Sequence, residues 1–264
     1  MTRILFVGHA TTLVEIAGTR FLTDPLLRSR VAHLRRIVPF PAGCRVTDPD
    51  AVLISHAHLD HLDLPSLRRL SPSARVVLPR GRAALARRAG LHEVIEVEAG
   101  DRVRIGRTDV LATPARHSGR RFPLGRATQA LGYLMEDPQR VYFAGDTDIF
   151  DGMRDLAGQL DLALLPVSGW GRRLPSGHLD PERAARAAAL LRPRYAVPIH
   201  WGTYLAPRAR PSSSERPAHE FARLTSSRAP DVEVRVLRPG EDLSIEERPA
   251  HHTGGASGGQ QPED

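Results

Sequence analysis

Four potential metal ligands fall within one segment of seven residues. This segment, SHAHLDH at residues 55–61, places His56, His58, Asp60 and His61 directly after the apolar run AVLI. In an extended chain, residues two apart share a face, so His56, His58 and Asp60 are expected to point the same way. His61 needs only a local turn to join them. Because imidazole nitrogens and carboxylate oxygens bind cations such as zinc, this spacing predicts a metal site.

Three other apolar runs end in residues of the same chemistry. DVLATPA is followed by Arg116 and His117, RVYFAG by Asp146, and YAVPI by His200. Taken singly, these could be a loop histidine, a turn aspartate and a packed histidine. If the four runs share one edge, the candidate ligands are His56, His58, Asp60, His61, His117, Asp146 and His200. Seven ligands are more than one tetrahedral zinc ion can bind, but they suit two adjacent divalent metals that share a bridging carboxylate.

The elements that must position these residues are mostly short strands. RILFVG, TLVEIA and RFLTD alternate in the manner of strands, and Gly18 is expected to turn the second into the third as a hairpin. A loop is expected from Pro25 to Pro49. Helices are expected in LPSLRRL, RGRAALARRAG, PERAARAAALL and ERPAHEFARLTSS. In the third of these, Asp180 would be the N-cap and Pro181 the first helical residue.

Two blocks of mostly β sequence, each followed by helices, predict an α/β fold with two sheets packed face to face and helices outside. No linker divides the chain, so one domain is expected over residues 1–248. The segment 249–264 is rich in Gly and Gln and is expected to be a disordered tail.

The motifs carry a family resemblance. HAHLDH resembles the HxHxDH signature of the metallo-β-lactamase superfamily, and the later His, the Asp of GDT and the last His follow in that superfamily's order. GHATTLVE, FLTDP, FAGDTD, HLDPERA and IHWGTY are similar to the branch that contains N-acyl-phosphatidylethanolamine phospholipase D and the ascorbate-6-phosphate lactonases. The likeness extends from about Arg3 to Glu246. It implies a four-layer αββα sandwich with a dinuclear metal centre at one edge of the sheets.

The same resemblance implies roles for individual residues. His56, His58 and His117 would hold the first metal; Asp60, His61 and His200 would hold the second; Asp146 would bridge them. His9 and Asp24 would orient ligands from close by, although both could instead only cap the backbone. His178 would donate a hydrogen bond to a substrate oxygen or lie on a loop. We expect zinc in both positions, with manganese or iron as alternatives that also suit nitrogen and oxygen ligands.

Two loops are more basic than the family pattern. SGRRFPLGRATQALGY follows His117, and SGWGRRLPSG surrounds Trp170. We expect them to overhang the metals, with Arg121, Arg172 and Trp170 in contact with an anionic small-molecule substrate, because arginine pairs with phosphate and carboxylate groups. The alternative is that these arginines are only solvated.

Composition limits the other classes of function. The chain of 264 residues has a net charge of +7 at pH 7, and all of its basic residues other than histidine are arginine. The basic residues are scattered without a long basic block, which argues against a nucleic-acid partner.

The sequence also bears on location. No apolar stretch is as long as a membrane-spanning helix, although contact of the protein with a membrane surface remains an alternative. MTRILFVGHA is expected to be a first strand and not a signal peptide. With one cysteine, Cys44, we expect a cytoplasmic protein.

The predicted function is that of a metal-dependent hydrolase. A water that bridges two divalent metals loses a proton near neutral pH, and Asp60 would orient the resulting hydroxide or receive a proton. Its target would be a phosphodiester or another phosphate-bearing ester. A lactonase acting on a sugar-phosphate lactone would use the same centre. A nucleic-acid processing factor or a non-catalytic binding protein on this fold is the remaining alternative.

Overall fold

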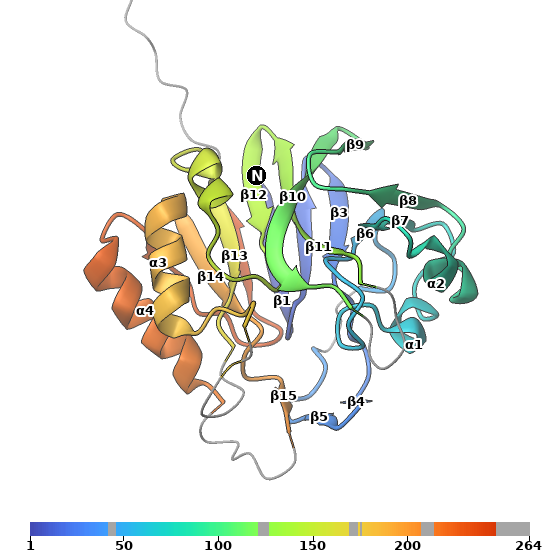
Figure 1. The fold of residues 1–264 in the computed structure, drawn as a ribbon, viewed down its shortest axis with the longest axis horizontal. Coiled ribbons are helices and arrows are strands. Elements are labelled where there is room, and N and C mark those ends of the chain that lie inside the picture. The colour runs from blue at the N-terminus through green and yellow to red at the C-terminus, as the bar shows by residue number, and fades with distance from the viewer. Residues whose placement is uncertain (42–45, 121–126, 169–173, 175, 207–213, 247–264) are drawn as a thin grey trace, which may run out of the picture.

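Alternating apolar side chains place the first strand inside the molecule with both of its faces covered. In β1 (Thr2–Gly8), Ile4 and Phe6 belong to one hydrophobic core, whereas Leu5 and Val7 belong to a second. Because neighbouring side chains of a strand point to opposite faces, such a strand needs packing partners on both sides. In the computed structural model, these partners are a second sheet on one side and helices on the other (Figure 1).

The structure describes residues 1–41, 46–120, 127–168, 174, 176–206 and 214–246. The tail predicted at residues 249–264 lies outside these ranges, as do Cys44, Arg121, Trp170 and Arg172.

The first sheet has seven strands among the described residues. It is antiparallel from β17 to β3 and parallel from β3 to β8. In spatial order, the strands are β17 (Asp242–Ile245), β1, β2 (Thr11–Ile16), β3 (Thr19–Thr23), β6 (Ala51–Leu53), β7 (Arg75–Pro79) and β8 (Val94–Val97). The hairpin predicted at Gly18 is confirmed: Ala17 and Gly18 have positive φ angles of 49° and 79° and join β2 to β3.

The second sheet is likewise divided into a parallel half and an antiparallel half. It is parallel from β16 to β12 and antiparallel from β12 to β9. In spatial order, the strands are β16 (Glu233–Val234), β14 (Tyr195–Ile199), β13 (Leu162–Pro166), β12 (Gln139–Phe143), β11 (Gln129–Asp137), β10 (Thr108–Ser118) and β9 (Arg102–Ile105). Each sheet therefore has a parallel half, in which all strands end at one edge.

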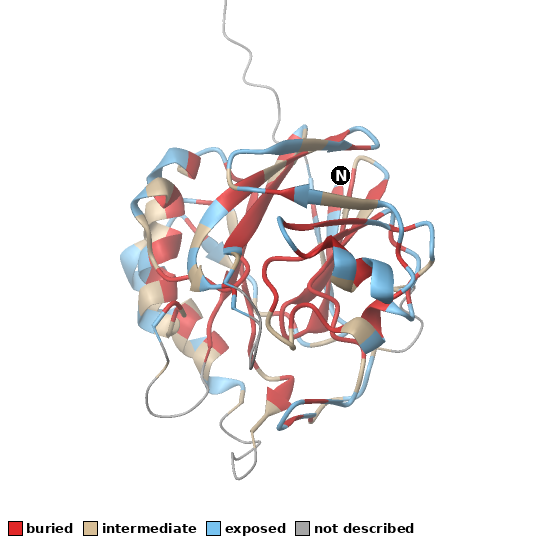
Figure 2. Cartoon of the chain, turned by 45° about the vertical axis from the view of Figure 1, so that its right-hand side comes forward, coloured by how far each residue is buried: buried red, intermediate tan, exposed pale blue. Residues whose placement is uncertain are grey.

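Helices cover the outer faces of both sheets (Figure 1). α3 (Pro181–Leu191) and α4 (Arg216–Arg228) lie on the second sheet, whereas α1 (Leu64–Leu67) and α2 (Ala83–Arg88) lie on the first. The short 3₁₀ helix η1 (Asp151–Leu156) packs beside α3. Figure 2 shows that the buried residues gather along the layers between these elements. The predicted four-layer αββα order is confirmed.

The start of α3 agrees with its sequence signals. The Asp180 side chain accepts a hydrogen bond from Arg183 N at 2.8 Å, and Pro181 is the first helical residue. Both features were expected, because the first turn of a helix has backbone N–H groups without partners, and proline lacks one of them. The helix ends at Leu191, and the next residue, Arg192, has a left-handed φ of 50°.

The loop expected from Pro25 to Pro49 contains regular structure. β4 (Arg30–Val31) and β5 (Leu34–Arg36) form a hairpin, and β5 pairs with β15 (Tyr204–Leu205) in a separate small sheet. Strands of two or three residues carry too little alternation to be detected. In addition, β5 pairs with β15, which is distant in the sequence, so local patterns do not reveal the pairing. Within the described ranges, every helix is too short or too polar to span a lipid bilayer.

Gly145 follows β12, and we predict that no larger residue can replace it without a loss of stability. Its φ is +59°, and a Cβ atom there would lie 2.6 Å from Ser55 Cβ and 2.9 Å from Leu131 O. Gly145→Ala should lower the free energy of unfolding by about 3 kcal/mol, the sum of backbone strain and overpacking. Gly158→Ala is the matched control, because Gly158 has a φ of +71° and no atom lies within 4 Å of the place that its added Cβ would take.

Urea denaturation of the two variants measures the difference directly. The control should lose only the backbone term, about 1 kcal/mol. Equal losses in the two variants would mean that the close approach of Gly145 to Ser55 does not constrain this edge.

Candidate metal centre

The candidate ligands lie where parallel strands of both sheets end. Asp24 directly follows β3, and His56 comes three residues after the end of β6. Asp146 comes three residues after β12, and His200 directly follows β14. Because the carboxyl ends of parallel strands meet at one edge, loops from four strands and both sheets converge there.

Three imidazoles form the first half of the site. His56 Nε2 lies 2.9 Å from His58 Nδ1, which in turn lies 3.2 Å from His117 Nε2. His56 is completely buried, whereas His58 and His117 are partly buried. A tetrahedral ion with nitrogen ligands at about 2.05 Å would space those nitrogens about 3.3 Å apart. The observed spacing is therefore close to that of a three-histidine metal site.

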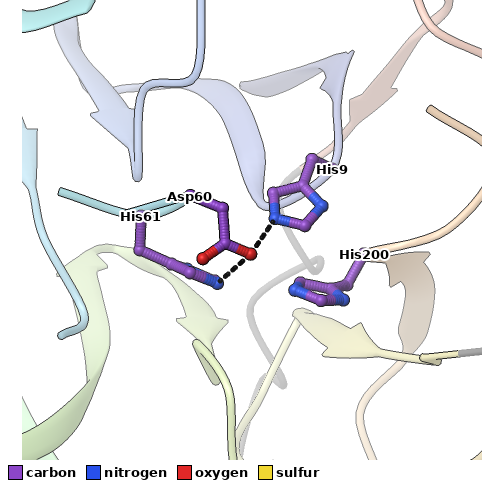
Figure 3. A group of neighbouring side chains, drawn as sticks. All are labelled: His9, Asp60, His61 and His200. Carbon is purple, nitrogen blue, oxygen red and sulfur yellow. Dashed lines mark hydrogen bonds and ion pairs between the residues drawn. The ribbon is translucent and has the colours of Figure 1, made fainter. Parts of the chain in front are cut away.

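The second half contains one carboxylate among three imidazoles (Figure 3). Asp60 Oδ2 lies 3.1 Å from His9 Nε2 and 3.7 Å from His61 Nε2. One ligand atom from each of His9, Asp60, His61 and His200 lies within 4.8 Å of the others. Figure 3 shows the ring of His200 opposite Asp60, on the same side as His9. This group could hold a second cation.

Asp146 lies between the two halves. Its Oδ1 is 3.3 Å from His200 Nε2, and its Oδ2 is 3.4 Å from His61 Nε2. Asp146 also groups with His117 and His178, and its Oδ2 lies 3.5 Å from His178 Nε2. Asp146 therefore has carboxylate oxygens near ligand atoms of both halves, His61 and His200 on one side and His117 on the other.

Hydrogen bonds on the outer side orient the imidazoles. Asp24 accepts from His61 Nδ1 at 2.7 Å and from Ser55 Oγ at 2.5 Å. Since the Ser55 hydroxyl donates to Asp24, it accepts from His56 Nδ1 at 2.9 Å. These bonds hold the Nδ1 protons of His56 and His61 away from the site, so that Nε2 of each ring faces inwards, as a metal ligand requires.

His117 and His200 are held in the same way. His117 Nδ1 donates to Gly177 O at 2.8 Å, and His200 Nδ1 hydrogen-bonds with Ser168 Oγ at 2.9 Å. Ser168 follows β13, so it comes from the strand between those that carry Asp146 and His200. The outer partner thus fixes the ring orientation in both halves.

The backbone is strained at three positions of the site. His9, Asp24 and His200 have positive φ angles of 59°, 31° and 66°, which side chains other than glycine rarely adopt. The strain is held by local bonds: His200 N donates to His9 O at 2.7 Å, and His9 N donates to Thr203 Oγ1 at 2.9 Å. Strained residues of this kind gather at functional sites, where surrounding structure fixes them.

Four histidines are held neutral. Burial lowers the pKa of His56 and His200 well below the usual value, lowers that of His117, and lowers that of His58 to about 4. Neighbouring imidazoles act in the same direction on His56 and His58. A neutral imidazole can bind a cation without first losing a proton. These four rings are therefore in the protonation state that metal binding needs at neutral pH.

The carboxylates favour positive charge at the centre. Burial would lower the pKa of His61, but Asp146, Asp60 and Asp24 outweigh it and raise that pKa well above its usual value. Burial would likewise raise the pKa of Asp60 and Asp146, yet the surrounding histidines, His61 first for Asp60 and His200 first for Asp146, hold both pKa values well below the usual range. Two ionised carboxylates therefore face the place where a cation would lie.

Buried atoms without hydrogen bonds support the same interpretation. Among the described residues, His61 Nε2 and Asp146 Oδ1 are buried and form no hydrogen bond. A buried polar atom left without a partner costs about 1 to 3 kcal/mol, and a bound ligand can remove that cost. Both atoms point into the cluster, and a divalent cation would satisfy both.

The structure brings together all of the proposed ligands, with one change to the expected geometry. Residues 58–61 form a turn, with Leu62 N donating to His58 O at 2.9 Å, so the segment is not extended. In this turn, Asp60 Oδ2 lies 3.1 Å from His9 Nε2. His178 lies beside Asp146, with Nε2 3.5 Å from Asp146 Oδ2. Arg121, Arg172 and Trp170 lie outside the described residues.

Three polar residues at the site carry no signal that separates them from ordinary strand ends. Ser55, Ser168 and Thr203 each hold a ligand or its loop by one hydroxyl. Ser55 and Ser168 each follow an apolar strand closely, as the proposed ligands do. Position at a strand end is the one signal in the sequence for these two serines.

Comparison with known proteins connects this site to a family. The family model described as a β-lactamase superfamily domain matches residues 19–201. A UPF0173 metal-dependent hydrolase of Caldivirga maquilingensis is 31% identical over 93% of this chain and 99% of its own. An N-acyl-phosphatidylethanolamine-hydrolyzing phospholipase D of Caenorhabditis elegans is 31% identical over 75% of this chain and 63% of its own. The structure of a metallo hydrolase from Ignicoccus hospitalis aligns with a TM-score of 0.72 and 26% identity, covering 94% of this chain and 99% of that one.

We predict that Asp24 controls metal affinity without binding the metal. Asp24→Asn should weaken zinc binding about 10-fold to 100-fold, because an amide has one acceptor oxygen and cannot accept from Ser55 N, the Ser55 hydroxyl and His61 Nδ1 together, as the carboxylate does. Asp50→Asn is the control: Asp50 is exposed and accepts from Arg20 N at 2.8 Å, remote from the centre. Competition with a fluorescent zinc chelator measures both affinities. An unchanged affinity in Asp24→Asn would show that its hydrogen bonds do not orient the ligands.

Proposed function

The chain belongs to the β-lactamase superfamily and is a metal-dependent hydrolase; from this premise we propose that it binds two zinc ions and cleaves phosphodiesters. The observation that carries the proposal is the position of Asp146, in contact with His61 and His200 and grouped with His117. A shared carboxylate between two sets of nitrogen ligands suits a pair of divalent cations. The donor set is nitrogen and oxygen only, which suits zinc, with manganese or iron as the alternatives.

The choice of a phosphodiester is supported by one relative and by chemistry. The Caenorhabditis elegans relative is named for hydrolysing N-acyl-phosphatidylethanolamine as a phospholipase D, which cleaves a phosphodiester bond. Two divalent ions, when bound, provide a water nucleophile near neutral pH and stabilise the charge that develops on both sides of a displaced phosphorus. We extend that substrate class, but not the lipid itself, to this chain.

Asp60 is proposed to position the nucleophile. Its side chain is 24% exposed, whereas those of His61 and His200 are 0% and 3% exposed, so Asp60 is on the side that solvent can reach. Because the imidazoles around it hold its pKa well below the usual range, Asp60 is ionised at neutral pH. It therefore orients an attacking water by accepting a hydrogen bond.

His178 is proposed to assist on the substrate side. It is partly buried, and its Nε2 lies 3.5 Å from Asp146 Oδ2. Its ring lies 4.7 Å from that of His117, so a substrate oxygen at the first half of the site would be within its reach. From this position, His178 can donate a hydrogen bond to an ester oxygen. Arg121, Arg172 and Trp170 are proposed to contact an anionic substrate.

A substrate screen tests the reaction class. Zinc-loaded protein should hydrolyse bis(4-nitrophenyl) phosphate, and a chelator should abolish the activity. γ-Butyrolactone, glucono-δ-lactone and a chromogenic β-lactam are the comparison substrates. Turnover confined to the lactones would replace the phosphodiester proposal with a lactonase. Turnover of none of these compounds by fully zinc-loaded protein would contradict it.

Asp60→Asn should lower kcat for the best substrate by at least about 10²-fold, the scale of a lost positioned acid–base group. The melting temperature should change little, because the residue is partly exposed and the amide keeps its size. Asp242→Asn is the control: Asp242 pairs with Arg3 at 3.0 Å on the far edge strand β17. Zinc content is measured beside the rate, so that metal loss is distinguished from a lost catalytic group. Full turnover in Asp60→Asn would remove Asp60 from the mechanism.

A further inference from the structure

A small cavity opens beside the candidate metal centre. It has a volume of about 200 Å³ and is lined by Val31, Ala32, His33, Leu34, His58, Leu59 and Asp60. One wall is therefore the ligand turn itself, and the opposite wall is the β4–β5 hairpin. Anything that fills this cavity lies next to two proposed metal ligands. The cavity is therefore continuous with the candidate centre.

The outer wall of the cavity, the β4–β5 hairpin, is held in place by its own packing. Val31 and Leu34, which are 1% and 9% exposed, pack with Leu26 and Tyr204 in a small hydrophobic cluster that Leu59 joins. The hairpin is closed by a two-residue turn at Ala32 and His33, because Val31 pairs with Leu34 and Arg30 with Arg35. The cavity wall is therefore regular structure with its own apolar core.

Long-range bonds connect this wall to the strained loop of the centre. Arg36 Nη2 donates to Val7 O at 2.7 Å, and Ile37 N donates to Thr203 O at 2.9 Å. Thr203 in turn accepts from His9 N through its hydroxyl. Figure 1 shows β4 and β5 beside β15, below the edge where the parallel strands end. The hairpin is thus fixed relative to His9 and, through it, to Asp60.

The lining sets the chemistry of the occupant. Four of its side chains are aliphatic, Val31, Ala32, Leu34 and Leu59, and the polar groups come from His33 and the two proposed ligands. A cavity of about 150 Å³ lined by apolar side chains can hold benzene. A space of about 200 Å³ therefore suits one aromatic ring or a short branched alkyl group. It is too small for most drug-sized ligands, whose pockets are about 300 to 1,000 Å³.

We infer that the substrate carries an apolar group about the size of a benzyl ring, which enters this cavity while the scissile bond lies at the metals. The inference rests on the proposed hydrolysis at the centre and adds the substituent that the chain selects. The β4–β5 hairpin is then the element that sets specificity, and Leu34 is the residue that limits the size of the group.

Binding of two phosphonates to zinc-loaded protein tests this without turnover. Methylphosphonate and benzylphosphonate present the same anion and differ in the apolar group. Benzylphosphonate should bind at least about tenfold more tightly, because the ring leaves water for the cavity. Leu34→Phe should reduce that ratio to about twofold or less by filling the space, with zinc content and methylphosphonate affinity unchanged. Isothermal calorimetry gives each dissociation constant.

Leu243→Phe is the matched control, because Leu243 is a partly buried strand leucine on β17, away from the cavity. It should keep the parental ratio. Leu34→Ala is the opposite change: it should enlarge the cavity and favour naphthylmethylphosphonate over benzylphosphonate relative to the parent. If Leu34→Phe does not fold, the Leu34→Ala result decides. A parental ratio near one, or a ratio that neither Leu34 variant alters, would overturn the inference.

A second measurement does not depend on the anion. Benzyl alcohol should shift the NMR methyl signals of Val31, Leu34 and Leu59 in a saturable way, and methanol at the same concentration should not. This experiment decides the case if neither phosphonate binds, and absence of any shift there would overturn the inference. Saturable benzyl alcohol binding in a protein that hydrolyses no phosphodiester would retain the cavity and reject only the proposed reaction.

Discussion

One buried carboxylate connects the fold to the candidate centre. Asp24, at the end of β3, is completely buried and accepts from Ser55 N at 2.7 Å, from the Ser55 hydroxyl and from His61 Nδ1. Its backbone is tied as well, since its N donates to Leu53 O and its carbonyl accepts from the Thr11 hydroxyl. Burying a polar side chain of this kind is costly unless it is hydrogen-bonded. Both halves of the site therefore depend on Asp24, the first through Ser55 and His56.

The arrangement has a cost that the surrounding structure offsets. His9, Asp24 and His200 hold uncommon backbone conformations, each costing about 1 to 3 kcal/mol. The histidines and aspartates at this edge also occupy positions where apolar side chains would otherwise pack. The two hydrophobic cores on either side of the first sheet supply the stability that tolerates this, and bound cations would add to it by mass action. Strain and buried charge are thus concentrated where the chemistry is proposed to occur.

Much of the fold and the ligand set could be predicted from the sequence, because the signals were local. Apolar alternation located the long strands, and Asp180 with Pro181 located the start of α3. The seven candidate ligands could be named because three histidines and an aspartate gather within residues 55–61 and because the order of motifs resembles a known superfamily. The geometry of residues 58–61 could not be predicted, since the turn depends on backbone bonds that residue types do not specify.

The parts that escaped prediction depend on contacts between distant segments. The small sheet forms when β5 meets β15, and neither strand is long enough to show a pattern. Ser55, Ser168 and Thr203 are common residue types whose roles follow only from the positions of the rings they touch. The cavity beside Leu34 and Leu59 likewise exists only once the hairpin lies against the ligand turn. Side chains that support a site are thus harder to predict than those that bind its metal.

The central claim is that two cations share one bridging carboxylate at this edge. Anomalous diffraction from crystals of zinc-loaded protein, collected above and below the zinc absorption edge, tests it most directly. We expect two peaks per chain, one among His56, His58 and His117, the other among Asp60, His61 and His200, with Asp146 between them. A single peak, or peaks elsewhere in the molecule, would contradict it.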